Sequence, residues 1–492
     1  MCGIVGIVGQ QPVNQEIYDS LLLLQHRGQD STGIATAESS GVFHQAKAHG
    51  YVREAFRTRD MRSLLGNSGL GHVRYATRGR AANEEEAQPF YVNAPYGIVL
   101  VHNGNLTNTR ELTDELFHRD RRHLNTSSDT ELLVNVLANE LQASITGLEL
   151  SPGQVFDAVT RLHERVEGSY AAIALIAGYG LLAFRDPFGI RPLILGARKA
   201  APGADGGPDR YEWIVASESL VLENGGFDIV RDVMPGEAVF VDLDGYLHTH
   251  QCAAAPRLVP CAFEYVYLAR PDSEMNGISV YEARLRLGDR LADTITRYTP
   301  KGAIDVVMPI PDSSRPAAMQ VARKLGIEYR EGFYKNRYVG RTFIMPGQAV
   351  RKKSVRQKLN AMSSEFKGKN VLLIDDSIVR GTTSKEIIQM ARDAGAAKVT
   401  FASAAPPVRY PHVYGINMPS RQELVAHGRT IPQIAKELGA DYLVYQEVDD
   451  MRDAILEGSD VEDLDMSCFD GRYITGTVTD EYLAWVEGAQ ES

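Results

Sequence analysis

Apolar and polar positions in the first half of the chain follow both strand and helix periods. Four apolar runs have strand length and predict β-strands at residues 4–8, 98–101, 171–176 and 181–184. Apolar residues recur at helical spacing in residues 17–24 and 132–141, which predicts amphipathic helices there. The Pro- and Gly-rich residues 200–209 predict a surface hairpin loop, because strand signals resume at Trp213.

Strands and helices alternate along the second half of the chain. Three apolar runs predict strands at residues 304–308, 371–374 and 399–402. One helix is predicted from Pro316 to just before Gly326, and another begins after Ser384 and ends before Gly395. This alternation predicts a doubly wound parallel sheet, in which ligands bind beyond the carboxyl ends of the strands.

The chain length and one low-charge stretch together predict two domains. At 492 residues the chain is longer than one hydrophobic core usually organises. Residues 251–260 contain two prolines and little charge, which favours a linker. We predict a first domain over residues 2–250 and a second over residues 261–492 with a C-terminal extension.

Composition and charge exclude several classes of function. Hydrophobic residues make up 44% of the chain and charged residues 23%, as in a globular protein. The formal net charge of −11 argues against nucleic acid as a partner, because phosphates need a basic face. No apolar stretch reaches the ~20 residues of a membrane span, so no membrane association is expected. The four cysteines favour a reducing compartment and predict a cytoplasmic protein.

Two carboxylates, Asp375 and Asp376, follow the strand predicted at residues 371–374. A loop rich in hydroxyls and glycine comes next, formed by Ser377, Gly381, Thr382, Thr383 and Ser384. A helix N-terminus presents N–H groups and a positive dipole end to a phosphate, and the hydroxyls can add donors. Adjacent carboxylates suit ribose hydroxyls or hydrated magnesium. The alternative is a structural turn with a solvated acidic pair.

This run resembles the 5-phosphoribosyl-1-pyrophosphate (PRPP) signature of the phosphoribosyltransferases. The resemblance implies that Ser313, Asp375 and Asp376 hold one Mg²⁺ per subunit together with PRPP. It also implies that the 5′-phosphate is bound by Ser377, Arg380, Gly381, Thr382, Thr383 and Ser384.

Residues 332–364 contain no Asp or Glu and many Lys and Arg. A solvated basic loop is the plain interpretation of this segment. Within it, residues 335–347 mix cations with large apolar side chains and resemble the family's flexible loop over pyrophosphate. The resemblance adds Lys335, Tyr338 and Arg341 to the PRPP site. We predict that this loop closes when PRPP binds and couples the two halves of the protein.

The chain begins with Met1, Cys2 and Gly3. Met before a small residue is normally removed, which would leave Cys2 with a free α-amine. An α-amine has a pKa of roughly 7.7–8.0 and can serve as the base that activates the thiol. The alternative for Cys2 is a buried small hydrophobe, the usual role of a free cysteine.

Four further motifs follow in order at residues 25–30, 71–77, 102–106 and 127–129. With the N-terminal Cys-Gly, they resemble the N-terminal-nucleophile glutamine amidotransferases, which fold as an αββα sandwich. The resemblance implies that Cys2 is the nucleophile and that the oxyanion hole is formed by the Asn103 side chain and the Gly104 N–H. It gives the glutamine carboxylate to Arg74 and the glutamine α-amine to Asp129, with Arg27 as a further glutamine-binding residue. Where the family has small residues after the second motif, this chain has Arg78 and Arg80.

The two halves together resemble the glutamine PRPP amidotransferase family. That resemblance implies an enzyme that moves ammonia from glutamine to C1 of PRPP, giving 5-phosphoribosylamine, glutamate and pyrophosphate at the start of purine biosynthesis. It also implies a homotetramer inhibited by purine nucleotides. Two alternatives stay open: another glutamine amidotransferase, such as a hexosamine or asparagine synthetase, and a PRPP-sensing regulator without catalysis. The PRPP signature argues against the first, and the complete glutaminase motifs argue against the second.

One branch of this family carries a cysteine-ligated iron–sulfur cluster, which normally needs four thiolates. By the resemblance, Cys261 and Cys468 keep two of the ligand positions, whereas His412 and Asp465 occupy the other two. We therefore predict that this protein has no iron–sulfur cluster.

Overall fold

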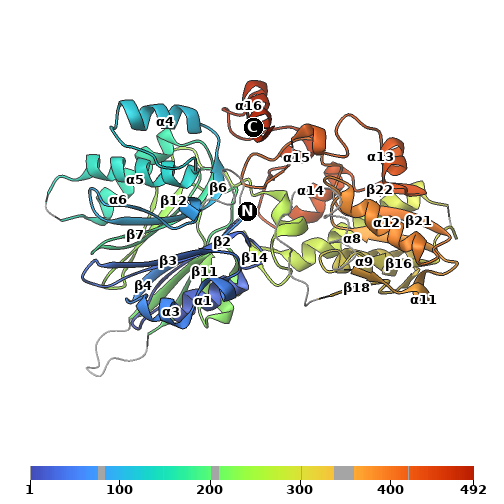
Figure 1. Cartoon of the computed structure of the whole chain (residues 1–492), viewed down its shortest axis with the longest axis horizontal. Coiled ribbons are helices and arrows are strands. Elements are labelled where there is room, and N and C mark those ends of the chain that lie inside the picture. The colour runs from blue at the N-terminus through green and yellow to red at the C-terminus, as the bar shows by residue number, and fades with distance from the viewer. Residues whose placement is uncertain are drawn as a thin grey trace.

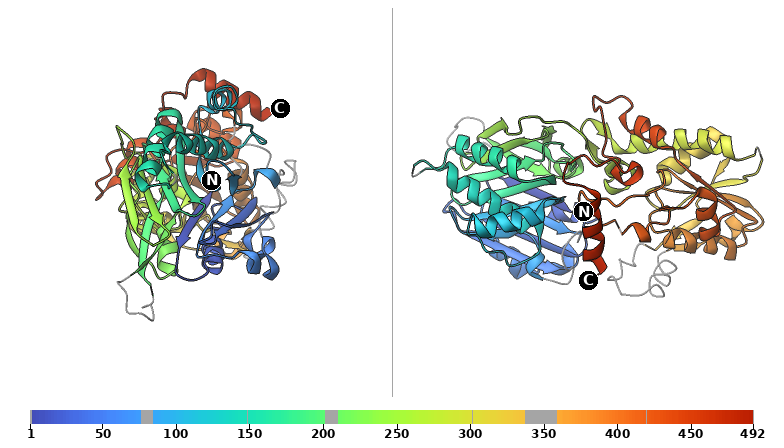
Figure 2. Two further views of the ribbon diagram at one scale, coloured as in Figure 1. Left: turned by 90° about the vertical axis from the view of Figure 1, so that its left-hand side faces the viewer. Right: turned by 90° about the horizontal axis from the view of Figure 1, so that it is seen from above.

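The computed structural model describes residues 2–75, 84–147, 149–200, 210–300, 302–336, 359–418 and 420–491. Figure 1 shows two lobes side by side, which we call the first lobe (to residue 260) and the second lobe (from residue 261). The N-terminus lies on the side of the first lobe that faces the second lobe (Figures 1 and 2). The described residues include no helix that is both long and apolar enough to cross a membrane.

The first lobe contains two antiparallel sheets that stack face to face. One sheet has the order β11-β9-β10-β1-β4-β2-β3, with strands β1 (Gly3–Val8), β2 (Ser31–Ala37), β3 (Phe43–His49), β4 (Ser68–Arg74), β9 (Ile194–Lys199), β10 (Tyr211–Ala216) and β11 (Asp228–Asp232). The other has the order β13-β12-β8-β7-β6-β5, with strands β5 (Phe90–Val92), β6 (Ile98–Leu106), β7 (Gly168–Ile176), β8 (Gly180–Arg185), β12 (Glu237–Asp242) and β13 (Leu247–Gln251). Their inner faces share a buried core that includes Ile4, Leu70, Val101, Ile173 and Val239.

Helices cover the outer faces of both sheets, so the predicted αββα sandwich is confirmed (Figure 1). The helices of this lobe are α1 (Asn14–Leu23), α2 (Val52–Ala55), α3 (Thr58–Ser63), α4 (Thr109–His118), α5 (Asp129–Ser144), α6 (Pro152–Arg165) and α7 (Ser219–Asn224), with a 3₁₀ turn, η1 (Glu84–Glu86). Helix α6 begins as its sequence dictates, because Ser151 and Gln154 form a capping box around Pro152. The strands that flank residues 200–209 pair antiparallel, as a hairpin requires, although residues 201–209 lie outside the described residues.

The second lobe contains a parallel sheet with the order β17-β16-β20-β21-β22. Its strands are β16 (Val306–Pro309), β17 (Glu328–Tyr329), β20 (Asn370–Asp375), β21 (Lys398–Ser403) and β22 (Tyr442–Tyr445). The larger helices are α8 (Val280–Tyr298), α9 (Arg315–Leu325), α12 (Thr382–Asp393), α13 (Ile431–Leu438) and α14 (Val448–Leu456). Leu372 and Ile374 pack with α8 and α9, whereas Val371 and Leu373 pack with α12 and α13. Helices on both faces confirm the predicted doubly wound sheet.

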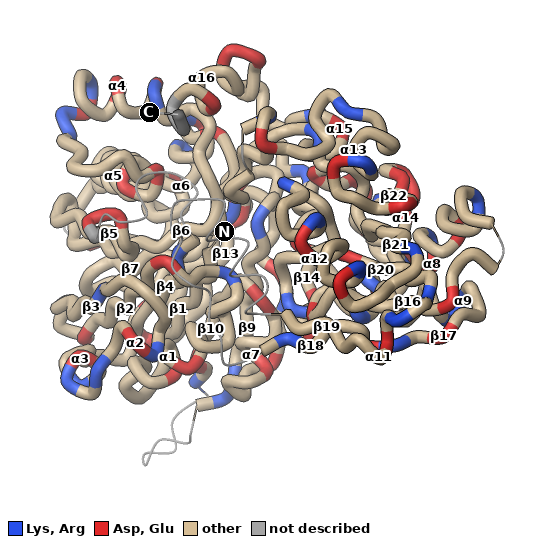
Figure 3. Tube along the Cα trace, turned by 45° about the vertical axis from the view of Figure 1, so that its right-hand side comes forward, with Lys and Arg blue, Asp and Glu red and all other residues tan. Residues whose placement is uncertain are grey.

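Shorter elements complete the second lobe. They are η2 (Glu264–Leu268), β14 (Glu274–Met275), β15 (Ile278–Ser279), β18 (Phe333–Lys335), β19 (Leu359–Ala361), α11 (Ser363–Phe366), η3 (Arg421–Glu423), α15 (Ser467–Asp470) and α16 (Asp480–Glu491). The C-terminal helix α16 returns to the first lobe, where the Arg110 guanidinium of α4 lies 4.0 Å from the centroid of the Trp485 ring (Figure 2). Acidic and basic residues are interspersed over both lobes (Figure 3).

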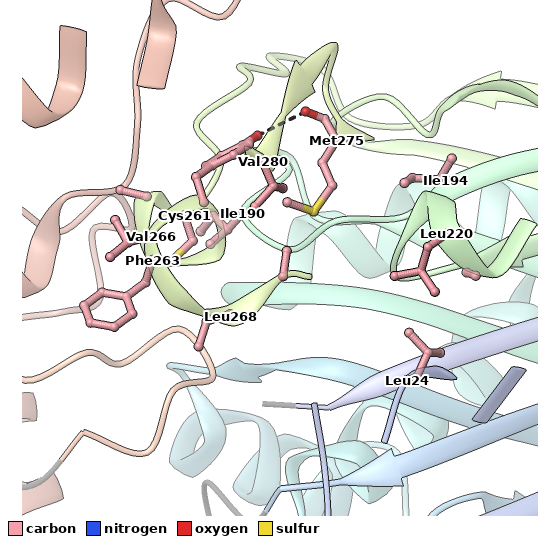
Figure 4. Packing of buried hydrophobic residues seen from close by; sticks show 14 of the residues in the cluster. Leu24, Ile190, Ile194, Leu220, Cys261, Phe263, Val266, Leu268, Met275 and Val280 are labelled. Carbon is pink, nitrogen blue, oxygen red and sulfur yellow. Dashed lines mark hydrogen bonds between the residues drawn. The ribbon is translucent and has the colours of Figure 1, made fainter. Parts of the chain in front are cut away.

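One hydrophobic cluster spans the two lobes. Leu24, Ile194 and Leu220 of the first lobe belong to the same buried cluster as Phe263 and Met275 of the second (Figure 4). The residues between Gln251 and this cluster connect the lobes without a long exposed linker, since Val259 and Cys261 are both buried. The joint between the lobes is therefore packed like a protein interior.

Several predicted elements have different bounds in the structure, and the differences in β6 and α12 affect the candidate sites. Strand β6 continues beyond residue 101 to Leu106, so the motif at residues 102–106 lies in a strand. Helix α12 begins at Thr382 instead of after Ser384, because the left-handed Gly381 (φ +75°) turns the chain directly into the helix. Thr382, Thr383 and Ser384 thus form the first helical turn, where the N–H groups are free of intrahelical partners.

Candidate active sites

Cys2 lies against Asn103 of the neighbouring sheet. The backbone nitrogen of Cys2 donates a hydrogen bond to Asn103 Oδ1 at 3.1 Å, and both residues are buried. The Asn103 amide nitrogen, Nδ2, is buried and has no hydrogen-bond partner among the residues that the structure describes. Leaving such a donor unpaired costs about 1–3 kcal/mol. The arrangement suits a donor that is kept for an oxyanion beside the Cys2 thiol.

Gly104 follows Asn103 in β6 and has a backbone conformation that requires glycine. Its φ is +149°, and a Cβ built there would lie 2.1 Å from the carbonyl oxygen of Ser169. No larger residue fits without moving β7. The sequence therefore places the Asn103 side chain and the Gly104 peptide next to each other, as an oxyanion hole needs.

Arg74 and Asp129 lie around the same end of the central strands. Gly3 pairs with Val73, which brings Arg74 at the end of β4 close to Cys2. Asp129 begins α5, and its Oδ2 accepts a hydrogen bond from the Leu106 N–H at 3.2 Å. The structure therefore gathers a cation and an anion near the thiol, which can fix the two charged ends of a free amino acid.

Sequence reasoning missed Glu86, which pairs with Arg74. Arg74 Nη2 donates to Glu86 Oε2 at 2.8 Å, and Glu86 Oε1 accepts from Ser127 Oγ at 3.1 Å. Glu86 lies in a run of three glutamates, a pattern that gives no signal of a buried carboxylate. Arg78 and Arg80, which the sequence singled out, lie outside the described residues.

Arg27, which the resemblance gives to glutamine binding, is paired with two buried carboxylates. Its side chain is fully buried, with ion pairs to Glu218 and to Glu264 at 2.6 Å. All three of its nitrogens donate to these two carboxylates. Arg27 thus links Glu218 of the first lobe to Glu264 of the second lobe, and its Cδ also lies 3.4 Å from a Cβ built on Gly3, the residue after Cys2.

The second site lies at the carboxyl end of the parallel sheet. Strands β16 and β20 are neighbours, so Ser313 after the first and Asp376 after the second meet at one edge. Ser313 Oγ donates to Asp376 Oδ2, and Ser377 Oγ donates to Asp376 Oδ1 at 2.5 Å. The three predicted magnesium ligands Ser313, Asp375 and Asp376 thus lie in one hydrogen-bonded group.

The electrostatics of this acidic pair fit a divalent cation. Burial raises the pKa of Asp375 well above its usual range, and the neighbouring Asp376 charge raises it further. Burial also raises the pKa of Asp376, although hydrogen bonds from Ser313 and Ser377 oppose the effect. Oxygen ligands and an unfavourable concentration of negative charge are the conditions under which proteins bind Mg²⁺.

Two of the remaining predicted PRPP residues, Lys335 and Arg380, are described and form ion pairs in this part of the second lobe. Arg380 is exposed and paired with Glu423 at 3.0 Å, just before the first turn of α12. Lys335 Nζ donates to Asp312 Oδ2 at 2.7 Å, beside Ser313. Tyr338 and Arg341 lie outside the described residues, as does the part of the predicted coupling loop that follows residue 336.

Cys261, His412 and Asp465 form a buried group that has the spacing of metal ligands. His412 Nε2 lies 3.3 Å from Cys261 Sγ and 3.1 Å from Asp465 Oδ2. The Tyr414 N–H donates to His412 Nδ1 at 3.2 Å, so the ring proton lies on Nε2 and faces Asp465. A metal would need the Nε2 lone pair instead. These residues fit a hydrogen-bond network and do not fit an iron–sulfur cluster.

We expect protein purified under anaerobic conditions to contain no stoichiometric iron or sulfide. Only two cysteines occupy this region, and burial raises the pKa of both the Cys261 and the Cys468 thiols, which keeps them protonated. Iron and acid-labile sulfide analysis measures this directly. Four iron atoms per chain, with the visible absorption of a cluster, would show that the prediction is wrong.

Comparison with known proteins finds a matching domain family in each lobe. Residues 72–204 match the glutamine amidotransferase domain family, and residues 278–413 match the phosphoribosyl transferase domain family. The chain is 55% identical to the amidophosphoribosyltransferase of Pseudomonas aeruginosa, over 100% of this chain and 96% of that relative. It is 53% identical to that of Escherichia coli, over 99% of this chain and 95% of that relative. A solved structure of the glutamine PRPP amidotransferase of B. subtilis in complex with ADP and GMP is 34% identical, with a TM-score of 0.83 over 97% of this chain and 98% of that chain.

The fold and the two sites define a glutamine amidotransferase joined to a phosphoribosyltransferase. The sequence identity across the full length identifies the family more closely. The chain belongs to the amidophosphoribosyltransferase family, which performs glutamine-dependent amidotransfer to PRPP as the first step of purine biosynthesis.

Proposed function

We propose that Cys2, once Met1 has been removed, is the nucleophile that releases ammonia from glutamine. The α-amine of Cys2 takes the thiol proton, and the sulfur attacks the carboxamide carbon. Asn103 Nδ2 and the Gly104 N–H stabilise the oxyanion that forms, while Arg74 and Asp129 hold the two ends of glutamine. Collapse of the intermediate releases ammonia, and water then frees glutamate from the thioester. The observation that carries this proposal is the Asn103 side chain, whose Oδ1 accepts from the Cys2 nitrogen while its buried Nδ2 has no acceptor within the described part of the chain.

In the second lobe, we propose that the first turn of α12 binds the 5′-phosphate of PRPP. The free N–H groups of Thr382, Thr383 and Ser384 supply donors, and the N-terminal dipole of the helix favours the anion. Asp375, Asp376 and Ser313 fit one Mg²⁺ per subunit, which when bound neutralises charge on the pyrophosphate leaving group. Ammonia from the first lobe attacks C1 of the ribose, and pyrophosphate departs. The hydrogen-bonded Ser313 and Asp376 at one sheet edge support this assignment.

We propose several further properties on the same basis. The functional domains comprise residues 2–250 and 261–492, the protein is cytoplasmic, and it acts as a homotetramer. Purine nucleotides inhibit it, in line with the nucleotides bound to the B. subtilis relative. Tyr338 and Arg341 join Lys335 in binding pyrophosphate.

The test is to measure glutamate and pyrophosphate released from glutamine and PRPP, with and without Mg²⁺. The proposal expects the two products in equal amounts and only with the metal. Glutamate without pyrophosphate would indicate a different amidotransferase. Binding of PRPP without either product would indicate a regulator.

A further inference from the structure

A segment of the second lobe lies directly on the strand that carries the oxyanion hole. Asn105, which follows Gly104 in β6, donates through Nδ2 to the Val413 carbonyl at 2.8 Å. Ser169 of the paired strand β7 accepts the Asn105 N–H at 3.3 Å and donates through its hydroxyl to the Tyr414 carbonyl at 2.8 Å. The chain at residues 412–415 is therefore bonded to β6 and β7 just beside the Cys2 site.

The Tyr414 carbonyl is held from a second direction by Arg191. Arg191 Nε and Nη2 both donate to it, the former at 2.7 Å and the latter at 2.5 Å. Arg191 is itself fixed by an ion pair with Glu264 at 3.0 Å, and both side chains are almost entirely buried. Charge-assisted bonds of this kind hold a backbone group more firmly than neutral ones.

The Tyr414 side chain is also fixed. The Thr475 N–H donates to the Tyr414 hydroxyl at 2.9 Å, and the two hydroxyl oxygens lie 3.0 Å apart. Two residues later, the Thr477 hydroxyl lies 2.7 Å from that of Thr107, directly after β6. Tyr414 is thus bonded to Thr475, and the segment that contains Thr475 is itself bonded to the first lobe through Thr477 and Thr107.

Gly415 makes the closest approach. A Cβ built on Gly415 would lie 2.8 Å from the Gly104 carbonyl carbon and 2.9 Å from both its Cα and its oxygen. Real Cβ atoms do not approach backbone this closely, so the two glycines are in direct backbone contact. The contacted atoms are the Cα and the carbonyl group of Gly104, so the contact constrains the Gly104 N–H, which is proposed to stabilise the oxyanion, through the shared Cα.

We propose that residues 412–415 are a positioning element for the oxyanion hole. Gly415 packs against the Gly104 backbone and fixes the position of Gly104 relative to Cys2. The first lobe therefore has a fully formed glutaminase site only when the second lobe is docked. This inference rests on the proposed roles of Cys2, Asn103 and Gly104. Its residues act through Gly104 and do not touch glutamine.

The test is Gly415→Ala, with Gly458→Ala as the matched control. Both glycines have positive φ, +99° and +80°, but no atom of the described residues lies within 4 Å of a Cβ at Gly458. Backbone strain is thus similar in the two variants, and only the new methyl group of Gly415→Ala clashes with the Gly104 backbone. We expect Gly415→Ala to lower kcat for glutamine hydrolysis about 10-fold or more, less than the ~10²–10³-fold loss of a whole oxyanion donor.

Two further readouts separate positioning from general damage. The KM for glutamine stays close to that of wild type, because Arg74 and Asp129 are untouched, and synthesis from ammonium is retained. Ser169→Ala removes the hydrogen bond to the Tyr414 carbonyl and the acceptor of the Asn105 N–H without adding an atom, and it should lower kcat several-fold. It provides the readout if Gly415→Ala does not fold.

Asn103→Ala distinguishes failure of this inference from failure of the site assignment. If Asn103→Ala loses activity while Gly415→Ala and Ser169→Ala keep wild-type kcat, the positioning role is wrong and the oxyanion hole stands. If Asn103→Ala also keeps its kcat, the oxyanion hole itself is wrong. A Gly458→Ala loss equal to that of Gly415→Ala would assign the effect to backbone strain and overturn the proposal.

Discussion

A Cys2→Ala variant loses synthesis from glutamine and keeps synthesis from ammonium. Removing the nucleophile leaves no covalent route to ammonia, so the glutamine-dependent rate should fall on the order of 10⁴-fold or more. The second site is built from a separate sheet at the carboxyl ends of β16 and β20, so it retains its geometry. Parallel assays with glutamine and with a high concentration of ammonium measure the two activities.

Cys252→Ala is the matched control for this experiment. Cys252 is a buried cysteine of the first lobe, and its sulfur lies 3.6 Å from the Phe156 carbonyl oxygen, among residues that pack on β12 and α6. It should keep both activities. Loss of the ammonium-dependent activity in a folded Cys2→Ala protein would contradict the separation of the two sites.

The Asp375→Asn, Asp376→Asn double variant should lose phosphoribosyl transfer with either nitrogen donor. Both carboxylates belong to the group that fits Mg²⁺, and neutral amides remove its negative charge. We expect kcat/KM for PRPP to fall about 100-fold or more with glutamine and with ammonium. Asp393→Asn, at the exposed far end of α12, should have no such effect. Near-normal activity of the double variant with ammonium would rule out the assigned role.

Thermal unfolding checks that the double variant is folded. The pKa values of both carboxyl groups are raised in the native protein, so their ionised forms are less favourable there than in the unfolded chain. In Mg²⁺-free buffer this destabilisation grows as the pH rises from about 3.9, the ordinary carboxyl pKa, through the raised native values. The double variant lacks these two ionisable groups and so lacks this destabilisation. Its Tm at neutral pH should therefore be at or above that of wild type. A lower Tm would attribute lost activity to a damaged fold.

The sequence predicted the architecture because its signals are local. Apolar runs located β1, β7, β8, β20 and β21, and the alternation in the second half defined the parallel sheet. The motifs also located Cys2, Asn103 and the acidic pair, whose chemistry depends on residue type and order.

Partnerships between distant residues could not be predicted in this way. Arg27 is part of a recognisable motif, yet its partners Glu218 and Glu264 lie about two hundred residues away and show no pattern of their own. The contact of Gly415 with Gly104 likewise depends on how the two lobes dock, which no local period records. Pairing of buried charges across a joint is a property of tertiary structure alone.

The hydrophobic cluster shared by the two lobes has a consequence for the protein as a thermodynamic unit. Because Leu24 and Leu220 are buried in the same cluster as Phe263 and Met275, neither lobe has a complete hydrophobic core of its own at the joint between the lobes. Unfolding of the first lobe would expose apolar surface of the second lobe and leave the buried carboxylate of Glu264 without Arg27 and Arg191. The stabilities of the two lobes are thus coupled through this cluster, and we expect the first lobe produced without the second to be less stable than it is in the whole chain.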